Sequence, residues 1–195
     1  MPTVTRLRED RRGRVAVELD GAPWRTLPVT VVVRAGLSEG RFLDRAALRV
    51  LRREVRRAEA LAVAGRALRA RDLSRSELAA RLERAAVTPA AAEESVAALA
   101  SAGLVDDGRL AGNRAEGLAA RGYGDAAVRH DLERRGLAPE LVATAMAALE
   151  PELERARRII ERRGVGARTA RYLAARGFAE DVLGEAVEAD FGHGP

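Results

Sequence analysis

Apolar and polar residues alternate along the first part of the chain, and apolar residues then recur at helical spacing through the rest of it. The alternation covers residues 3–9, 14–20 and 24–27. Two sequences that are typical of tight turns, Arg12-Gly13 and Asp20-Gly21, separate these three segments. The pattern predicts a small antiparallel meander of three strands.

The next segment, residues 28–36, is open to two interpretations. Its valines favour a strand by propensity, whereas Pro28 can open a short helix and Gly36 can end it. In such a helix Val29, Val32 and Val33 would share one face. We favour the helix over the strand.

Composition changes near residue 45. Seven of the 18 valines lie in the first 33 residues, but 38 of the 41 alanines lie from residue 46 onward, which favours helices there. Asp44 is a plausible N-cap, and the helical pattern after it continues to Arg71. Its apolar residues recur at spacings of three and four and predict one buried stripe, formed by Leu48, Leu51, Val55, Ala58 and Ala62.

Two further helix starts follow. Ser74-Arg75-Ser76-Glu77 has the sequence of a capping box, and Thr88-Pro89 suits the N-cap and first position of a helix that Gly103 ends. Asp107 is expected to cap the next helix, with Asp106 near the same positive helix end.

The helical part repeats itself. Shifting the chain by 50 residues aligns Leu78 with Val128 and Leu82 with Leu132, and a shift of 41 aligns Leu132 with Leu173. Each copy follows a further helix, so the pattern predicts three tandem three-helix units, roughly 59–103, 107–150 and 152–190.

These elements give a mainly α fold: a small antiparallel β-rich N-terminal segment, then three helix-turn-helix-like repeats in an extended curved array. The domain boundaries that we expect are 1–43 for the β-rich segment, 44–103 for the long basic helix with the first repeat, 104–150 for the second repeat, and 151–195 for the shorter third repeat with an acidic end.

All 34 basic residues are arginine, and their placement is uneven. Between residues 41 and 75 there are 11 arginines against four acids, an excess of seven. On the predicted helix Arg45, Arg49, Arg52 and Arg56 recur at i, i+4, i+7 and i+11. Such a row is typical of a protein that binds a polyanion, while a solvated face written in GC-rich codons is the alternative.

A second basic group lies in the middle repeat around Gly122-Tyr123-Gly124. The glycine pair suits a tight turn between helices better than a phosphate loop, because no strand precedes it.

Composition excludes several classes of chemistry. Without lysine or cysteine the chain has no Schiff-base lysine, thiol nucleophile or zinc finger, and its only histidines are His130 and His193. We therefore expect no enzyme activity, no cofactor and no metal. The six aromatic residues are too few for a base-stacking platform of the RRM or OB type. The absence of a long apolar run predicts a soluble cytoplasmic protein.

The sequence resembles the RecX family of bacterial regulatory proteins, which modulate the RecA recombinase. The resemblance lies in the capping box with Leu78 and Leu82, in the stretch from Gly103 to Ala111, and in Arg121-Gly122-Tyr123-Gly124 followed by 132–136. It implies binding along the groove of the RecA–DNA filament, reduced or tuned recombinase, ATPase and coprotease activity in recombination and the SOS response, and contacts with single- and double-stranded DNA. We expect a monomer.

The expected DNA- and filament-binding residues are all arginines: Arg45, Arg49, Arg52, Arg53, Arg56, Arg57, Arg71, Arg75, Arg121, Arg129, Arg134 and Arg135. The alternative function is a helix-turn-helix transcriptional regulator. Its recognition helix would be the segment from Pro89 to Ala102, which is mostly alanine and carries Glu93 and Glu94, so that helix would repel phosphate.

Overall fold

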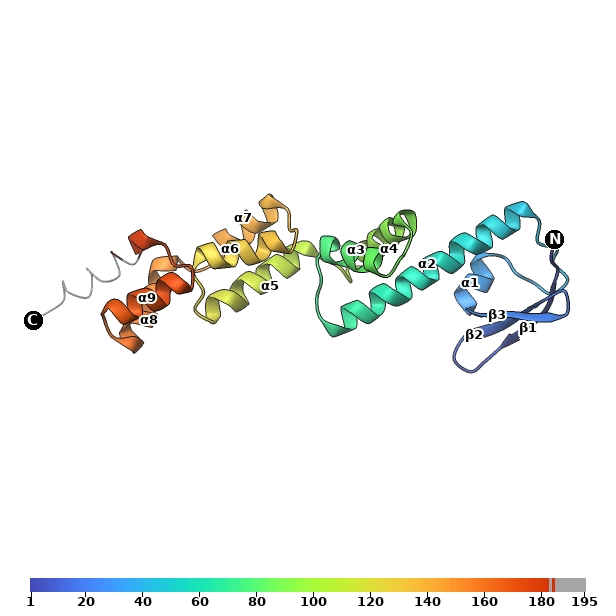
Figure 1. Cartoon of the computed structure of the whole chain (residues 1–195), viewed down its shortest axis with the longest axis horizontal. Helices are drawn as coiled ribbons and strands as arrows, with labels where there is room; N and C mark the ends of the chain where they lie inside the picture. Colours follow the sequence, from blue (N-terminus) through green and yellow to red (C-terminus); the bar gives the residue numbers. More distant parts are fainter. Residues whose placement is uncertain (183, 185–195) are drawn as a thin grey trace, which may run out of the picture. The chain divides into compact units, whose positions relative to one another are not determined.

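The computed structural model describes residues 1–182 and 184 of the chain, which are mostly helical after an N-terminal sheet (Figure 1). The described residues group into two compact units. The first contains Met1–Arg71 and Leu78–Ala102, and the second contains Asp72–Glu77 and the residues from Gly103 onward. Most of the acidic segment 180–190 and the predicted end of the third repeat lie outside the described residues.

The sheet has the predicted meander topology. Strands β1 (Val4–Glu9), β2 (Arg14–Leu19) and β3 (Ala22–Pro28) pair antiparallel in the order β1-β2-β3. The first hairpin turn is held by Asp10, whose carboxylate accepts hydrogen bonds from the backbone N–H groups of Arg12 and Arg14.

The ambiguous segment after the sheet is a short helix, α1 (Val29–Arg34), as the favoured interpretation predicted. Of the three valines that share a helical face, Val32 is buried and Val29 packs against the core, whereas Val33 is 71% exposed. Val31 is buried as well. The helix starts two residues after the core residue Leu27 of β3, and Val31 packs toward the sheet.

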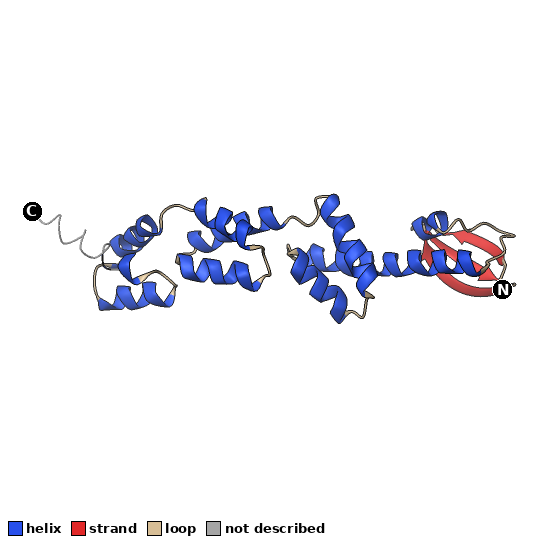
Figure 2. Ribbon diagram, turned by 90° about the horizontal axis from the view of Figure 1, so that it is seen from above, coloured by secondary structure: helices blue, strands red, loops and turns tan. Residues whose placement is uncertain are grey.

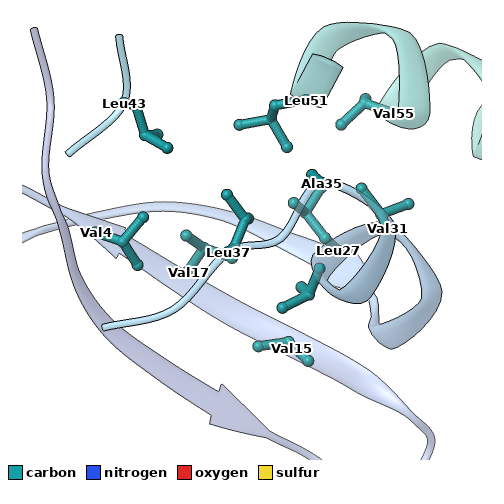
Figure 3. Packing of buried hydrophobic residues seen from close by; sticks show 11 residues of the cluster. Val4, Val15, Val17, Leu27, Val31, Ala35, Leu37, Leu43, Leu51 and Val55 are labelled. Carbon is teal, nitrogen blue, oxygen red and sulfur yellow. The ribbon is translucent and has the colours of Figure 1, made fainter. Parts of the chain in front are cut away.

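Helix α2 (Arg45–Ala70) begins at the predicted N-cap, where the Asp44 carboxylate accepts a hydrogen bond from Ala47 N at 2.7 Å. Its N-terminal half covers one face of the sheet (Figure 2). Figure 3 shows Leu51 and Val55 of α2 above a core of sheet and α1 side chains that includes Val17 and Leu27.

The buried stripe of α2 does not continue as predicted. Ala62 is exposed, and the C-terminal half of the helix instead buries Ala60, Ala64 and Ala67. This half contacts α4 rather than the sheet, and α4 lies on a different side of α2. Alanine on both helices allows their axes to approach closely.

The remaining helices are α3 (Arg75–Arg84), α4 (Pro89–Ser101), α5 (Asp107–Ala120), α6 (Asp125–Arg134), α7 (Pro139–Ala147), α8 (Glu152–Arg163) and α9 (Ala167–Ala175). Helix α4 ends just before Gly103 and α5 ends just before the Gly122-Tyr123-Gly124 turn, as predicted. The capping box is present, since Glu77 N donates to Ser74 Oγ at 3.0 Å and Ser74 N donates to the Glu77 carboxylate at 3.1 Å.

One expected cap is shifted by a residue. Asp106 is the N-cap of α5 and accepts from Arg109 N at 2.9 Å, while Asp107 accepts from Arg75 N at 2.9 Å. The prediction for Asp107 was wrong because its carboxylate is used by the N-terminal turn of another helix, α3.

Within the second unit, two Arg-Gly turns contact the start of another helix in the same way. The carbonyl of Arg135 accepts from Ser74 Oγ at 2.6 Å, before α3, and the carbonyl of Arg176 accepts from Gly124 N at 2.8 Å, before α6. The glycine after each arginine has a positive φ, +69° at Gly136 and +80° at Gly177. These equivalent contacts give the 41-residue sequence periodicity a structural reason.

Candidate nucleic-acid interface

Four arginines form a row along α2. Arg45, Arg49, Arg52 and Arg56 are exposed, and their spacing places them on one side of the helix over about 16 Å, at about 1.5 Å per residue. Among the residues that the structure describes, no ion pair or side-chain hydrogen bond engages these four guanidinium groups. We call this set the α2 arginine row.

The neighbouring arginines of α2 are less free. Arg53 is exposed but its guanidinium lies 3.4 Å from the buried Glu54 carboxylate, and Arg57 is partly buried. Arg71 is exposed at the C-cap of the helix. The row is therefore the part of α2 with the most cationic groups available to a partner.

The α2 arginine row continues in the same register as a row of buried alanines. Arg56 is followed at i+4, i+8 and i+11 by Ala60, Ala64 and Ala67. The side of α2 that carries arginine in its first half therefore receives α4 in its second half. The alanine row ends the exposed cationic surface where the helix packing begins.

A groove of about 520 Å³ lies within the first unit, where the arginine row of α2 gives way to the buried alanines. It is lined by Arg56 and Arg66 of α2 and by the turn between α3 and α4, which ends at Thr88. Thr88 is the N-cap residue of α4, but its side chain makes no capping hydrogen bond. Two guanidinium groups, a hydroxyl and a helix N-terminus suit an anionic group such as phosphate.

One carboxylate also lines this groove. Glu59 is bound by Arg25 of β3 at 2.6 Å, and both side chains are about half exposed. This pairing offsets the negative charge of Glu59, so the groove keeps a cationic character from Arg56 and Arg66.

The predicted basic residues of the second unit do not share one role. Arg75, Arg121 and Arg129 are exposed, and Arg134 is 71% exposed with Asp131 at 3.6 Å. They extend from three different elements, since Arg75 starts α3, Arg121 follows α5, and the other two lie on α6.

Arg135 is instead part of an internal network. Its side chain is 14% exposed, and it donates to Asp131 at 2.9 Å and to Glu77 at 3.1 Å. Asp131 also accepts two hydrogen bonds from Arg114, at 2.8 and 2.9 Å. These bonds from Arg114, together with those from Arg135, hold the pKa of the Asp131 carboxyl well below its usual range, although burial acts in the opposite direction.

The glycine pair of the middle repeat forms the predicted turn between helices, here α5 and α6. The N–H of Gly124 is bonded to Arg176, and Tyr123 lies against the Arg176 guanidinium, 4.7 Å from its ring centroid. Asp125, the first residue of α6, pairs with the buried Arg155. The groups of this turn that a phosphate loop would use are thus engaged within the protein.

Comparison with known proteins bears on this architecture. A family model described as "RecX, second three-helix domain" matches residues 106–146. Regulatory protein RecX of Deinococcus radiodurans is 34% identical over 145 residues, which cover 69% of this chain and 70% of that protein. The chain belongs to the RecX family.

Other RecX proteins agree with this assignment. Regulatory protein RecX of Stenotrophomonas maltophilia strain R551-3 is 37% identical over 113 residues, 58% of this chain and 69% of that protein. A crystal structure of regulatory protein RecX matches with a TM-score of 0.79 at 18% identity and covers 97% of this chain and all of that one. RecX from Lactobacillus salivarius matches with a TM-score of 0.60 at 14% identity, over 69% of this chain and 96% of that chain. The two structures show a shared fold.

The RecX domain match spans α5, α6 and most of α7, which are the helices around the Arg135 network. Their core is formed by small and aliphatic residues, among them Ala115, Val128 and Leu132. Asp131 and Arg135 lie at the edge of this core, so in this RecX-family chain they tie the three-helix domain to the start of α3.

Sequence reasoning missed two features of this RecX-family chain. Arg66 lines the groove but lies outside the predicted row, and Glu77 binds Arg135 from 58 residues away. The capping-box motif already marked Glu77, but it gave no signal of a second partner. In the part of the chain that the structure describes, no cluster of side chains suits a metal ion and no helix is long and apolar enough to cross a membrane.

Proposed function

We propose that this RecX-family chain is a non-enzymatic regulator that binds the RecA–DNA filament and lowers or tunes its recombinase, ATPase and coprotease activities. The observation that carries the proposal is the α2 arginine row, with four exposed guanidinium groups that lack counter-ions among the described residues. In this proposal the chain acts as a monomer in the cytoplasm, during recombination and the SOS response.

The α2 arginine row is suited to phosphate rather than to bases. It is on one side of an intact helix whose opposite side packs on the sheet, and the groove at Arg56 and Arg66 extends it. Contacts to phosphate position a protein on DNA without reading sequence, so both single- and double-stranded DNA are expected ligands. Such a surface also favours fast, salt-sensitive association.

The remaining predicted arginines fall into two groups in this proposal. Exposed side chains such as Arg75, Arg121, Arg129 and Arg134 add secondary contacts to the filament. Arg135 has a structural role, because its guanidinium is already bound by Asp131 and Glu77. The proposed binding surface therefore includes the exposed arginines that the sequence predicted, but not Arg135.

A helix-turn-helix transcriptional regulator is less favoured. Helix α4 buries Ala91, Ser95 and Leu99, and its exposed side includes Glu93 and Glu94. A helix entering the major groove needs polar side chains that reach base edges, and two carboxylates there repel the DNA backbone. The charge of this helix therefore supports a regulator without sequence-specific reading.

The test is DNA-dependent ATP hydrolysis by RecA assembled on single-stranded DNA, measured with the full chain added up to stoichiometric amounts. We expect a decrease that requires the α2 arginine row. A variant with Arg45, Arg49, Arg52 and Arg56 replaced by Gln should reduce the effect, because Gln keeps helix propensity while removing charge.

A second variant provides the matched control for that assay. It replaces four exposed arginines outside the proposed surface, Arg158, Arg162, Arg168 and Arg171, with Gln and so loses the same charge. The control variant should still inhibit. Unchanged ATP hydrolysis at stoichiometric amounts of the unmodified chain contradicts the proposed function.

A further inference from the structure

The N-terminal sheet has one covered face and one open face. Val15, Val17 and Leu27 point into the core beneath α1 and α2 (Figure 3). Side chains alternate between the two faces of a strand, so their neighbours lie on the open face. The pairing register aligns Arg8 with Ala16 and Ala16 with Thr26 across the three strands, and all three are exposed.

Trp24 is at a bulge in β3. The register shifts between Val17 and Glu18, so that Trp24 is the extra residue on β3. Arg25, next to it, reaches Glu59 on the α2 side of the sheet, and alternation along the strand from Arg25 assigns Trp24 to the open face. Trp24 is 43% exposed. A bulge re-aims a side chain, and here it presents an indole ring that the core does not use.

Two arginines of β1 lie on the open face. Arg6 and Arg8 are exposed, and the register places Arg8 in line with Ala16. Arg14, whose guanidinium donates to the Thr26 carbonyl at 3.1 Å, instead lines a pocket beside α2 with Val55 and Ala58. Glu18 pairs with Arg6 across β1 and β2 and adds a carboxylate to this face. The centre of the face, Ala16 and Thr26, has small side chains that leave the arginines and the indole accessible.

We propose that the open face of the N-terminal sheet binds single-stranded DNA, with Trp24 stacking on an unpaired base and Arg6 and Arg8 contacting the adjoining phosphates. This surface is distinct from the α2 arginine row, and its ligand chemistry goes beyond the proposed function because it recognises a base face. Binding of single-stranded DNA to this face requires no RecA.

Single-stranded DNA fits this face better than a duplex. An indole stacks on a base only where the base is free of its neighbours, whereas duplex bases are already stacked. Arg6 and Arg8 supply attraction to the backbone, and every base offers a π-face, so the binding is expected to be tolerant of sequence. The composition argued against a base-stacking platform built from several aromatic rings. The proposed site differs from such a platform because it uses a single ring, that of Trp24.

Trp24 provides its own probe, because it is the only tryptophan in the chain. The experiment titrates the full chain with an oligo-dT strand, and separately with a duplex of the same length, while indole fluorescence is recorded at low salt. We expect saturable quenching by the single strand and little change with the duplex. Equal quenching by both, or none by the single strand, overturns the proposal.

Variants extend this test. Trp24→Ala should weaken binding to a labelled single strand by about tenfold, and Trp24→Phe should restore most of it, because a smaller ring still stacks. Duplex binding should be unchanged in both. Val33→Ala, which trims an exposed apolar side chain of α1, serves as the control and should bind as the unmodified chain does.

The outcomes separate this inference from the proposed function. Quenching that persists after the α2 arginine row is replaced by Gln supports a second DNA site. Fluorescence that responds to RecA without DNA, and not to the single strand, assigns the face to a protein partner and contradicts the inference. Failure of the RecA assay alone leaves the Trp24 result standing, because the titration contains no RecA.

Discussion

Gly124 and Gly177 meet backbone to backbone in the second unit. A Cβ on Gly124 would lie 2.3 Å from the carbonyl carbon of Gly177, closer than side-chain atoms approach backbone. The same approach allows Ala126 N to donate to the Gly177 carbonyl at 3.2 Å. Gly124 therefore serves the docking of the turn after α9 onto the start of α6.

Replacing Gly124 by Ala should destabilise the second unit. The added methyl meets backbone atoms that cannot rotate away, so we expect a loss of about 1 to 3 kcal/mol in the free energy of unfolding. The measurement is urea unfolding followed by circular dichroism. Gly117→Ala in α5 is the control, because a Cβ there meets nothing within 4 Å and should leave stability equal or higher.

The α2 arginine row should set the salt dependence of DNA binding. Replacing Arg45, Arg49, Arg52 and Arg56 by Gln removes four potential phosphate contacts, so the slope of log K against log salt should become less negative by about 3 to 4. Titrations of labelled DNA at several salt concentrations measure this slope. The control with Arg158, Arg162, Arg168 and Arg171 replaced should change it little, and an unchanged slope in the row variant would mean that the row is only solvated.

Replacing the adjacent residues Arg134 and Arg135 should change stability by different amounts. Arg135→Gln removes the charge-assisted hydrogen bonds that join Asp131 to Glu77 and should cost about 2 to 3 kcal/mol of stability, with little effect on the DNA salt slope. Arg134→Gln, at a side chain that is 71% exposed, should change stability by less than about 0.5 kcal/mol. Equal loss of stability in both variants would contradict the structural role given to Arg135.

The Asp131 network should also make stability depend on pH. The pKa of Asp131 is lowered in the folded state, chiefly by hydrogen bonds from Arg114, so its contribution is present above the unfolded value of about 3.9 and is lost as pH falls toward the folded pKa. Asp131→Asn lacks this contribution. The difference in unfolding free energy between the two chains should be large at about pH 7 and shrink below about pH 4. A difference that stays constant over this range would show that the carboxylate charge is not what stabilises the network.

Local signals were enough to predict most of the secondary structure. The capping box at Ser74 and the N-cap at Asp44 bond groups three residues away, and Asp20-Gly21 joins the paired residues Leu19 and Ala22, so the meaning of each can be read from sequence. The repeat periodicity predicted the helical units for the same reason, because each unit buries its own apolar positions.

Contacts between distant segments decided the rest. Ala62 had the right spacing for a buried stripe on α2, but the helix changes its packing partner from the sheet to α4, and no local pattern records that change. Arg134 and Arg135 are chemically identical neighbours in the sequence. Only the tertiary structure separates them, because Glu77 lies 58 residues before Arg135 and reaches it through the contact at the start of α3.

The sequence by itself determined the helical repeats, the N-terminal meander and the row of arginines on one side of α2. Each follows from spacing along a single element, where side-chain direction is set by the backbone period. Tertiary structure decided which cations stay available and why Gly124 has no side chain. Those outcomes depend on which surfaces meet, and the free energy of a buried ion pair or a backbone contact exists only once both partners are in place.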